Sequence, residues 1–397
     1  TSETMTQIPT EFEIKIDKIV PNGYGLGFAH GCAIFVSLAA EGDLARVRVR
    51  EQKGKTVFAE IIEIIEPSAE RVAPVCRYFG SCGGCDFQQM SYAAQLSAKS
   101  EIISDSLSRI GKFSDFGEVE VAASPNPLGY RTRTEWHLDT IRNRIGYFRR
   151  FSHDVVDIEE CPVMAGPLAE KLKEIRSSIE WHQFASDRPS IEAACGSSGI
   201  SVFSDEIFEP TDEISVEVDG FKLSFDAGTF FQANPLLIED LVSCAIGTAS
   251  GATAIDLYSG VGLFSLPLTR RFQNVLAVEG NPRSVAFAEI NRVSAQADNL
   301  KIDESDVASW LEDNREVEEL DFLLLDPPRN GCQKSSLELI ARIAPRHISY
   351  VSCDPSTLAR DLRVLCDKGY RLVTVTGFDL FPQTHHVETV ARLERVS

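Results

Sequence analysis

From Gly251 onward, apolar segments of strand length alternate with stretches that have the residue spacing of amphipathic helices. Five of the apolar segments read AIDLYS, NVLAVEG, DFLLLD, HISYVS and RLVTVTGFDL. Strands that alternate with helices form a mostly parallel sheet, because each helical crossover returns the chain parallel to the previous strand. This part of the chain is therefore predicted to be a Rossmann-like, doubly wound α/β domain.

The N-terminal part has a different pattern. Residues 12–66 contain about five short β-rich segments separated by turn signals. Such a set predicts a small OB-like β-barrel, although an ordinary structural β-domain would have the same pattern. Pro67 and Pro74 then mark a linker.

A helix is predicted over 92–112, because apolar residues recur there at helical spacing and Gly111 suits its C-cap. Strand-like segments follow to about Phe225, so the middle of the chain is predicted to be an α+β domain. A length of 397 residues agrees with two or three domains. We expect the helix to pack on the last of three domains, with the boundaries 10–67, 68–222 and 223–397.

The charge and composition limit the location and the partners of the chain. No apolar run of about 18 residues is present, which predicts no transmembrane helix. Residues 1–13 have no basic segment followed by an apolar one, which predicts no secretory signal. We expect a cytoplasmic monomer, in which ten cysteines do not form a disulfide framework. With a formal charge of −20, the chain can bind nucleic acid only through a local basic region.

Such a region lies in the middle of the chain, where six arginines stand against two acids: Arg131, Arg133, Arg142, Arg144, Arg149 and Arg150. Four aromatic residues lie beside or among them: Tyr130, Trp136, Tyr147 and Phe148. Arginines for phosphates and aromatic rings for unpaired bases are typical of single-stranded RNA sites. The pattern predicts an RNA-binding strip; a solvated strand face with aromatic core residues is the alternative.

A glycine-rich turn follows the first strand of the C-terminal pattern. Gly260 and Gly262 let the backbone approach a ligand closely. Glu279 ends the next strand about 20 residues later, where a carboxylate suits hydrogen bonds to a ribose diol. No third glycine follows at the dinucleotide spacing. The turn therefore favours a smaller adenosyl ligand over NAD.

Four polar residues stand at or near the ends of predicted strands: Asp256, Glu279, Asp326 and Cys353. Ligands bind at the carboxyl ends of strands in open α/β sheets, so these residues are predicted to line one site. Cys353 precedes Pro355 and a helix start, where a thiolate is stabilised by backbone amides. The ordinary role of a free cysteine is that of a small buried hydrophobe.

A reactive cysteine beside an adenosylmethionine site indicates covalent catalysis on uracil. A thiolate that adds to carbon 6 converts the ring into an enolate, and carbon 5 then accepts a methyl group. A general base must remove the proton from carbon 5 so that the thiolate can leave. Glu388 is the candidate base, and His385 and His386 are alternatives, because histidine titrates near neutral pH.

Three cysteines crowd into ten residues at Cys76, Cys82 and Cys85, and Cys161 is available as a fourth thiolate. The two glycines of the Cys-Gly-Gly-Cys sequence let the chain turn tightly and aim amides at the sulfurs. A four-thiolate zinc site and an iron–sulfur cluster both fit this spacing.

Five motifs, in this order along the chain, resemble the RNA uracil-5-methyltransferase family, which forms 5-methyluridine in transfer and ribosomal RNA: FFQAN, DLYSGVGLFSLPL, LLLDPPRNG, SCDPSTLARDL and FPQTHHVETVARL. The N-terminal segment resembles a TRAM domain, the RNA-binding barrel of many members. The segment CRYFGSCGGCDFQ, with the distant CPV, resembles the members that carry a 4Fe–4S cluster.

The resemblance implies an α/β methyltransferase domain in which S-adenosyl-L-methionine is bound by Gln232, Tyr258, Glu279, Asp306 and Asp326. It implies that Cys353 is the nucleophile and Glu388 the base. It also implies a structural 4Fe–4S cluster held by Cys76, Cys82, Cys85 and Cys161 in the central domain. One residue departs from the family pattern: Leu263 stands where a small polar residue is expected, so we leave it out of the site.

The resemblance implies RNA as the substrate, with 23S ribosomal RNA favoured over transfer RNA and the target uridine turned out of its stack. Two alternatives differ from this interpretation. A DNA cytosine methyltransferase shares the thiolate chemistry but carries a Pro-Cys nucleophile, whereas Ser352 precedes Cys353 here. A non-catalytic iron–sulfur RNA-binding protein would not need the complete set of motif residues.

Overall fold

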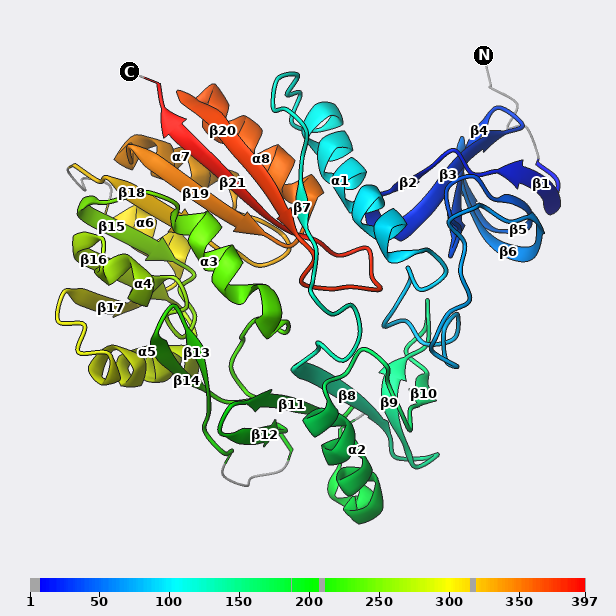
Figure 1. Cartoon of the computed structure of the whole chain (residues 1–397), viewed down its shortest axis with the longest axis horizontal. Coiled ribbons are helices and arrows are strands. Elements are labelled where there is room, and N and C mark those ends of the chain that lie inside the picture. Colours follow the sequence, from blue (N-terminus) through cyan, green and yellow to red (C-terminus); the bar gives the residue numbers. More distant parts are fainter. Residues whose placement is uncertain (1–7, 187, 207–210, 315–318, 397) are drawn as a thin grey trace.

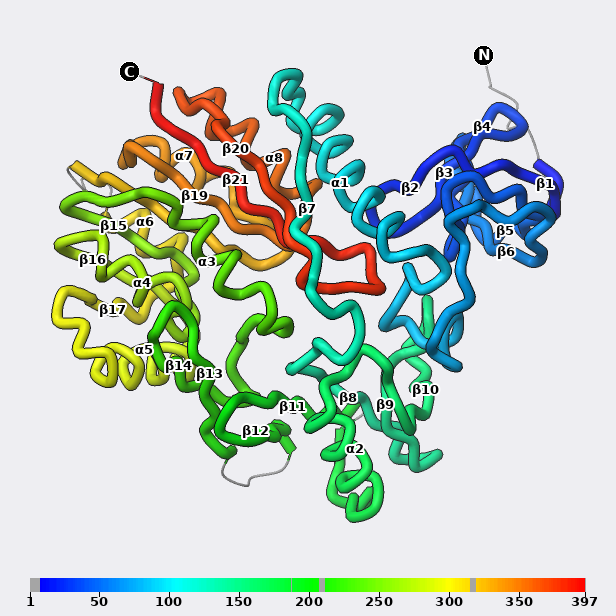
Figure 2. Tube along the Cα trace, in the orientation of Figure 1, coloured from blue at the N-terminus to red at the C-terminus, as the bar shows by residue number. Residues whose placement is uncertain are grey.

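The computed structural model describes residues 8–186, 188–206, 211–314 and 319–396. Figure 1 shows an N-terminal β-sheet, a central region of strands and one helix, and a large sheet covered by helices. In the trace of Figure 2 the chain runs from the N-terminal sheet through helix α1 (Tyr92–Arg109) into the central region. It forms most of the large sheet last.

The large sheet has eight strands in the order β17-β16-β15-β18-β19-β21-β20-β7. Their bounds are β7 (Val121–Ala122), β15 (Gly251–Leu257), β16 (Phe272–Glu279), β17 (Leu300–Glu304), β18 (Phe322–Leu325), β19 (His347–Ser352), β20 (Tyr370–Phe378) and β21 (Glu388–Arg395). Strands β15 to β19 pair in parallel, whereas β21 runs antiparallel to both of its neighbours. The predicted doubly wound domain is confirmed, and the strand order reverses at β15 and β18, where such sheets bind ligands.

Helices cover both faces of this sheet. One face carries α3 (Ile238–Ile246), α4 (Ser265–Thr269) and α5 (Pro282–Ser294), and the other carries α1, α6 (Val307–Asp313), α7 (Lys334–Ile343) and α8 (Pro355–Asp367). Phe322 and Leu324 of β18 pack in the first core, and Leu323 and Leu325 in the second. Because both faces are buried, the strand is apolar at every position.

Helix α1 packs against two sheets at once. Ala98 and Ile102 pack with residues of the N-terminal sheet, while Ile103 and Leu107 join the core of the large sheet. The helix therefore lies between these two sheets, as Figure 1 shows.

The N-terminal sheet has six strands in the order β1-β5-β6-β4-β3-β2. Their bounds are β1 (Glu11–Lys15), β2 (Lys18–Val20), β3 (Tyr24–Ala29), β4 (Cys32–Ser37), β5 (Leu44–Lys53) and β6 (Thr56–Glu66), with a 3-10 turn at η1 (Pro21–Gly23). The first of the five expected strands is divided in two. Ile16 donates its amide to Asp43 on one side, and Asp17 donates to Leu26 on the other, so the chain changes its partner strand between them.

The expected closed barrel is not found. Within the described residues no strand pairing joins β1 to β2, which form the two edges of the sheet. The two strands are nevertheless separated by only two residues, so the sheet curves enough to bring its edges near each other.

The central region contains a five-stranded sheet in the order β10-β9-β8-β11-β12. Its elements are β8 (Arg133–Asp139), β9 (Arg144–Phe148), β10 (Val155–Asp157), α2 (Gly166–Ser178), η2 (Trp181–Gln183), β11 (Ser190–Gly196) and β12 (Gly199–Phe203). Leu168 and Leu172 of α2 pack with Trp136 of β8 in a core of its own. A hairpin of β13 (Ile214–Val218) and β14 (Phe221–Phe225), followed by η3 (Pro235–Leu237), leads into the large sheet. Within the described residues no helix combines the length and the apolar composition needed to cross a membrane.

Candidate functional site

The pairing of two strands brings two predicted catalytic residues to the same edge of the sheet. β19 and β21 are antiparallel, and their last registered pair is Ser352 with Thr389. Cys353 lies in the bend directly after β19, and Glu388 is the first residue of β21. The charge of Glu388 acts on the Cys353 thiol, so the two groups lie near each other where the parallel strands end.

Burial and neighbouring acids set the charge of this pair. Burial, together with Glu388 and Asp326, raises the pKa of the Cys353 thiol to about 12. Burial and Asp326 also hold the pKa of Glu388 well above its usual range, and this side chain is only 3% exposed. Burial raises the pKa of Asp326 to about 7. The Cys353 thiol therefore keeps its proton at neutral pH, and burial disfavours the charged form of the Glu388 carboxyl.

The two histidines near Glu388 differ in their surroundings. Burial, with the neighbouring His385, lowers the pKa of His386 to about 3, so its imidazole is neutral and a weak base. The Nδ1 atom of His385 lies 2.5 Å from a carboxylate oxygen of Asp86, far away in the sequence. Of the three candidate bases, Glu388 is the one whose charge acts on the Cys353 thiol.

The predicted cofactor turn is built around Glu279. Its carboxylate accepts hydrogen bonds from the amides of Gly260 at 2.8 Å and Asn281 at 2.7 Å. Tyr258, at the start of the turn, has a φ of 64°, a left-handed conformation that is uncommon for a bulky residue and typical of functional sites. Asp256 is fully buried, and burial raises the pKa of its carboxyl to about 7.

Of the other two predicted cofactor residues, Gln232 is buried and Asp306 is exposed. Gln232 is 4% exposed, and its Oε1 atom has no hydrogen-bond partner among the described residues. Asp306 is exposed and caps helix α6, where its carboxylate accepts from the amide of Ser309 at 3.0 Å. Ser305, beside Asp306, donates its amide to the carbonyl of Glu279, so Asp306 still lies at the edge of the sheet that carries the turn.

Leu263 departs from the family pattern for a packing reason. Its side chain is 7% exposed and packs in the core of the large sheet with Val261 and Phe264. An apolar residue therefore suits this position without a contact to a ligand.

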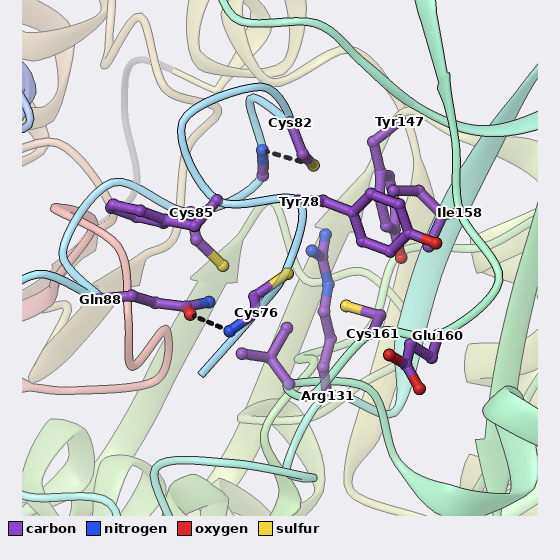
Figure 3. Close-up of a pocket in the computed structure, with 13 residues that line it drawn as sticks. Cys76, Tyr78, Cys82, Cys85, Gln88, Arg131, Tyr147, Ile158, Glu160 and Cys161 are labelled. Atoms are coloured by element: carbon purple, nitrogen blue, oxygen red, sulfur yellow. Dashed lines mark hydrogen bonds between the residues drawn. The ribbon is translucent and has the colours of Figure 1, made fainter. Parts of the chain in front are cut away.

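All four predicted metal ligands line one cavity, with their thiols on its wall: Cys76, Cys82, Cys85 and Cys161 (Figure 3). The amide of Gly84 donates to Sγ of Cys82 at 3.3 Å. Gln88 accepts from the amide of Cys76, while its buried Nε2 atom has no partner among the described residues. Within the same residues, no three Cys, His, Asp or Glu side chains meet closely enough to hold one metal ion.

The predicted RNA strip is wrong for most of its aromatic residues. Trp136 and Tyr147 are buried in the core of the central region, and Tyr130 is buried with its hydroxyl against the carbonyl of Pro382. The ring of Phe148 stacks on His137, with centroids 3.7 Å apart.

Two of the six arginines also point inward. Arg131 lines the cysteine cavity, and Arg133 forms an ion pair with Glu192 at 2.5 Å. Arg142, Arg144 and Arg149 are exposed. The strip therefore keeps an exposed basic part, while alternate residues of its strands face the core, as in any sheet with one buried face.

Sequence reasoning missed the residues that hold the loop before Glu388. Lys99 of α1 forms a fully buried ion pair with Asp379, and Asp86 contacts His385. Asp86 directly follows Cys85, but nothing in the sequence pairs it with a residue 299 positions away.

Known proteins resemble the whole chain. Residues 200–396 match the family model described as tRNA (Uracil-5-)-methyltransferase. A protein of Thermosynechococcus vestitus named an uncharacterized RNA methyltransferase is 31% identical, over 96% of this chain and 97% of that protein. The 23S rRNA (uracil(1939)-C(5))-methyltransferase of Aeromonas salmonicida is also 31% identical, over 98% and 97%.

A solved structure adds the fold. The tRNA (uracil-54, C5)-methyltransferase of Pyrococcus abyssi, in complex with S-adenosyl-L-homocysteine, aligns with a TM-score of 0.72. It is 26% identical in sequence, and the alignment covers 96% of this chain and 99% of that one. The likeness includes the N-terminal sheet and the central region as well as the large sheet. The chain belongs to the RNA uracil-5-methyltransferase family.

Proposed function

We propose that this methyltransferase modifies carbon 5 of a uridine in RNA through a covalent bond between Cys353 and the uracil ring. The observation that carries the proposal is the pairing of β19 with β21, which brings Cys353 and Glu388, each one residue beyond the pair of Ser352 and Thr389, to the ligand-binding edge of the sheet, where Asp326 affects both. S-adenosyl-L-methionine, when bound, supplies the methyl group.

Cys353 and Glu388 divide the chemistry on the uracil between them. The Cys353 thiol loses its proton to water, and Sγ bonds to carbon 6 while the electrons of the 5,6 double bond move toward the carbonyl oxygen at carbon 4. After carbon 5 is methylated, Glu388 takes the proton from that carbon. The double bond forms again and the sulfur–carbon bond breaks, which returns the free cysteine. Because burial favours the protonated form of both groups, the thiol must lose its proton before it attacks, and the carboxyl must be ionised before it can take the proton from carbon 5.

Five residues are proposed to hold the cofactor: Gln232, Tyr258, Glu279, Asp306 and Asp326. Gln232 offers a buried acceptor without a partner, which is costly unless a ligand donates to it. Glu279 is oriented by two backbone amides, which fixes its carboxylate at the turn where a ribose would lie. Asp306 has the weakest support, since its carboxylate is used as a helix cap.

The four thiols are proposed to hold a 4Fe–4S cluster with a structural role. A single zinc ion would need all its sulfurs at about 2.3 Å from one point, which these thiols do not offer. A cluster places iron and sulfide between the cysteines, and the thiols do surround a cavity. The unpartnered Nε2 of Gln88 on the cavity wall suits a hydrogen bond to a cluster sulfur. Cys76, Cys82, Cys85 and Cys161 would be its ligands.

The substrate is proposed to be 23S ribosomal RNA, with transfer RNA as the alternative. The name of the Aeromonas salmonicida relative supports 23S ribosomal RNA, and the name of the Pyrococcus abyssi protein supports transfer RNA. Arg142, Arg144 and Arg149 offer exposed positive charge to the RNA backbone. Phe230, two residues before Gln232, is 63% exposed and suits stacking on an unpaired base.

The domain division and the oligomeric state remain proposals as well. The N-terminal sheet ends at Glu66, which supports a TRAM-like RNA-binding domain over 10–67. The expected boundary at residue 223 falls within β14, and the hairpin of β13 and β14 packs on the large sheet, so we propose that the catalytic domain begins with this hairpin, near residue 214. We propose that the protein acts as a cytoplasmic monomer.

RNA that contains 5-fluorouridine tests the function directly. Fluorine cannot leave carbon 5 as a proton does, so the parent protein with S-adenosyl-L-methionine should form a stable covalent complex with this RNA, visible as a band shift in a denaturing gel. Cys353→Ala should form none and should have no measurable turnover on unmodified RNA. DNA of the same sequence is the control substrate. Normal turnover by Cys353→Ala would end the covalent mechanism.

A further inference from the structure

The loop that leads into Glu388 is held by residues outside the large sheet. It comprises residues 379–387 and reaches from β20 toward the start of α1 (Figure 1). Lys99 of α1 pairs with Asp379 and donates to the carbonyl of Phe381 at 3.0 Å. Tyr130 donates its hydroxyl to the carbonyl of Pro382, also at 3.0 Å. The strand that carries Glu388 is therefore entered through a loop whose position depends on the central region.

Asp86, the residue after Cys85, makes several of these contacts. One carboxylate oxygen accepts from the amide of His385 at 2.8 Å, and the other lies 2.5 Å from its Nδ1. The backbone amides of Asp86 and Phe87 both donate to the carbonyl of Gln383, at 3.1 and 3.0 Å. Asp86 is 8% exposed, so these bonds are shielded from water. Four hydrogen bonds thus join two adjacent residues of the cysteine loop to a three-residue stretch of the catalytic loop.

The stretch of the catalytic loop that Asp86 and Phe87 contact includes a residue with an uncommon backbone conformation. Gln383 has a φ of 68°, in the left-handed region that side-chain-bearing residues seldom adopt, so the surrounding contacts must hold it there. His385 lies three residues before Glu388, which is the first residue of β21. A shift of His385 is therefore passed to the carboxyl of Glu388 over a very short length of backbone.

We propose that Asp86 is a positioning residue that couples the cysteine loop to the general base: by fixing His385, it sets the place of Glu388 relative to the uracil ring. The proposal rests on the proposed function, because it needs Glu388 as the base. It adds that the conformation of the cysteine loop affects the rate of proton removal by Glu388, although no electron is transferred in the reaction. A change in the cysteine loop reaches Glu388 through Asp86.

The kinetic effect of losing this coupling is specific. Thiolate addition and methylation depend on Cys353 and the cofactor turn, whereas proton removal from carbon 5 depends on Glu388. Asp86→Ala should therefore slow the last step, by about 100-fold if the carboxyl moves by an ångström. Methylated RNA bonded to Cys353 should accumulate on unmodified substrate. Asp86→Asn, which can still accept from the amide of His385, should recover most of the rate.

The experiment uses the full-length protein purified without oxygen, with its metal in place. The variants are Asp86→Ala, Asp86→Asn and His385→Ala, with Asp154→Ala as the control because Asp154 is an exposed acid of the same region. Single-turnover assays measure the covalent methylated species and the released product. Iron content and hydrogen exchange of the amides in 382–388 are measured on the same samples.

The expected result is an accumulated covalent species and faster amide exchange in Asp86→Ala and in His385→Ala, with iron content and cofactor affinity at the parent level. The double variant Asp86→Ala with His385→Ala should be no slower than either single variant, because both substitutions remove the same interaction. If Asp86→Ala loses its iron, His385→Ala decides, since it leaves the cysteine loop unaltered. Parent-like turnover and exchange in His385→Ala would overturn the proposal.

Failure of the inference can be told apart from failure of the function. If the parent protein forms no complex with 5-fluorouridine RNA, the covalent mechanism itself is wrong. If the parent forms the complex and the Asp86 and His385 variants release product at the parent rate, only the coupling is wrong. If Glu388→Gln turns over normally while His385→Ala stalls, His385 is the base, and Asp86 would orient a catalytic group rather than position Glu388.

Discussion

The catalytic edge of the large sheet and the cysteine region are built in different ways. At the edge, Cys353 and Glu388 stand at the ends of two hydrogen-bonded strands, so the sheet itself fixes their relation. In the cysteine region, three of the four thiols come from a loop of turns and isolated bridges, and Cys161 comes from another loop. One site is set by backbone pairing that persists without a ligand. The other depends on what binds the thiols.

The difference predicts opposite responses to substitution. A change at the catalytic edge should alter a chemical step and leave the fold intact, because the strands keep their hydrogen bonds. A change in the cysteine region should alter folding first, because metal binding and folding are coupled there.

The largest effect is expected for Cys82→Ser. Loss of one ligand should remove the iron and the brown colour, and the yield of soluble folded protein should fall, since metal binding and folding are coupled. Cys366→Ser, at a half-buried thiol of α8 outside the cavity, is the matched control and should keep both. Iron analysis and the thermal unfolding midpoint measure the outcome. A soluble protein with stoichiometric zinc and no iron would contradict the cluster.

Glu388→Gln should leave the fold and the iron unchanged but slow turnover by about 10²–10⁴-fold, the usual contribution of a general base. The thiolate can still add and the methyl group can still arrive, so methylated RNA should remain bonded to Cys353. A radiolabelled methyl group on a covalent protein–RNA complex measures this. His386→Ala is the comparison, since His386 is a weak base. Parent-like turnover by the Gln variant would show that Glu388 is not the base.

The pH dependence should follow the buried thiol. Burial raises the pKa of Cys353 to about 12, so only a small fraction is thiolate at neutral pH, and that fraction grows about tenfold for each pH unit. Adduct formation with 5-fluorouridine RNA should therefore rise with pH from 6 to 8. A flat profile would show that deprotonation of Cys353 does not limit the reaction.

The smallest effect is expected on the exposed basic part of the central region. Arg142→Ala combined with Arg149→Ala should weaken RNA binding several-fold and reduce the salt dependence of binding, because two phosphate contacts are lost. The rate at saturating RNA should not change. Lys173→Ala, at an exposed cation of α2, is the control. Unchanged affinity would remove these arginines from the RNA surface.

The two regions also differ in how far the sequence predicts them. Apolar strands that end in Asp256, Glu279, Asp326 and Cys353 sufficed to predict the edge, because parallel strands bring their carboxyl ends together whatever the loops do. Glu388 reached the same edge because β21 is antiparallel, which no pattern in the sequence announced. The sequence offered Glu388 as the candidate base, with His385 and His386 as alternatives, and the family resemblance then implied that it is the base.

The central region was predicted less well, since alternate strand residues face opposite sides and the sequence does not say which side is the core. The aromatic residues counted as an RNA strip therefore turned out to be core residues, and Arg131 lines a cavity. The contact of Asp86 with His385 joins segments 299 residues apart, and it depends on how two loops meet in space. Local spacing carries no information about such contacts.

The place of β21 has a consequence for the synthesis of the protein. β21 follows β20 in the chain but lies between β19 and β20 in the sheet. Until its residues leave the ribosome, β19 and β20 each present an unpaired edge, and the base has not yet been made. A chain that stops before Glu388 would be inactive, and its two open strand edges would favour aggregation. Premature termination at this point should therefore produce insoluble protein rather than a partly active enzyme.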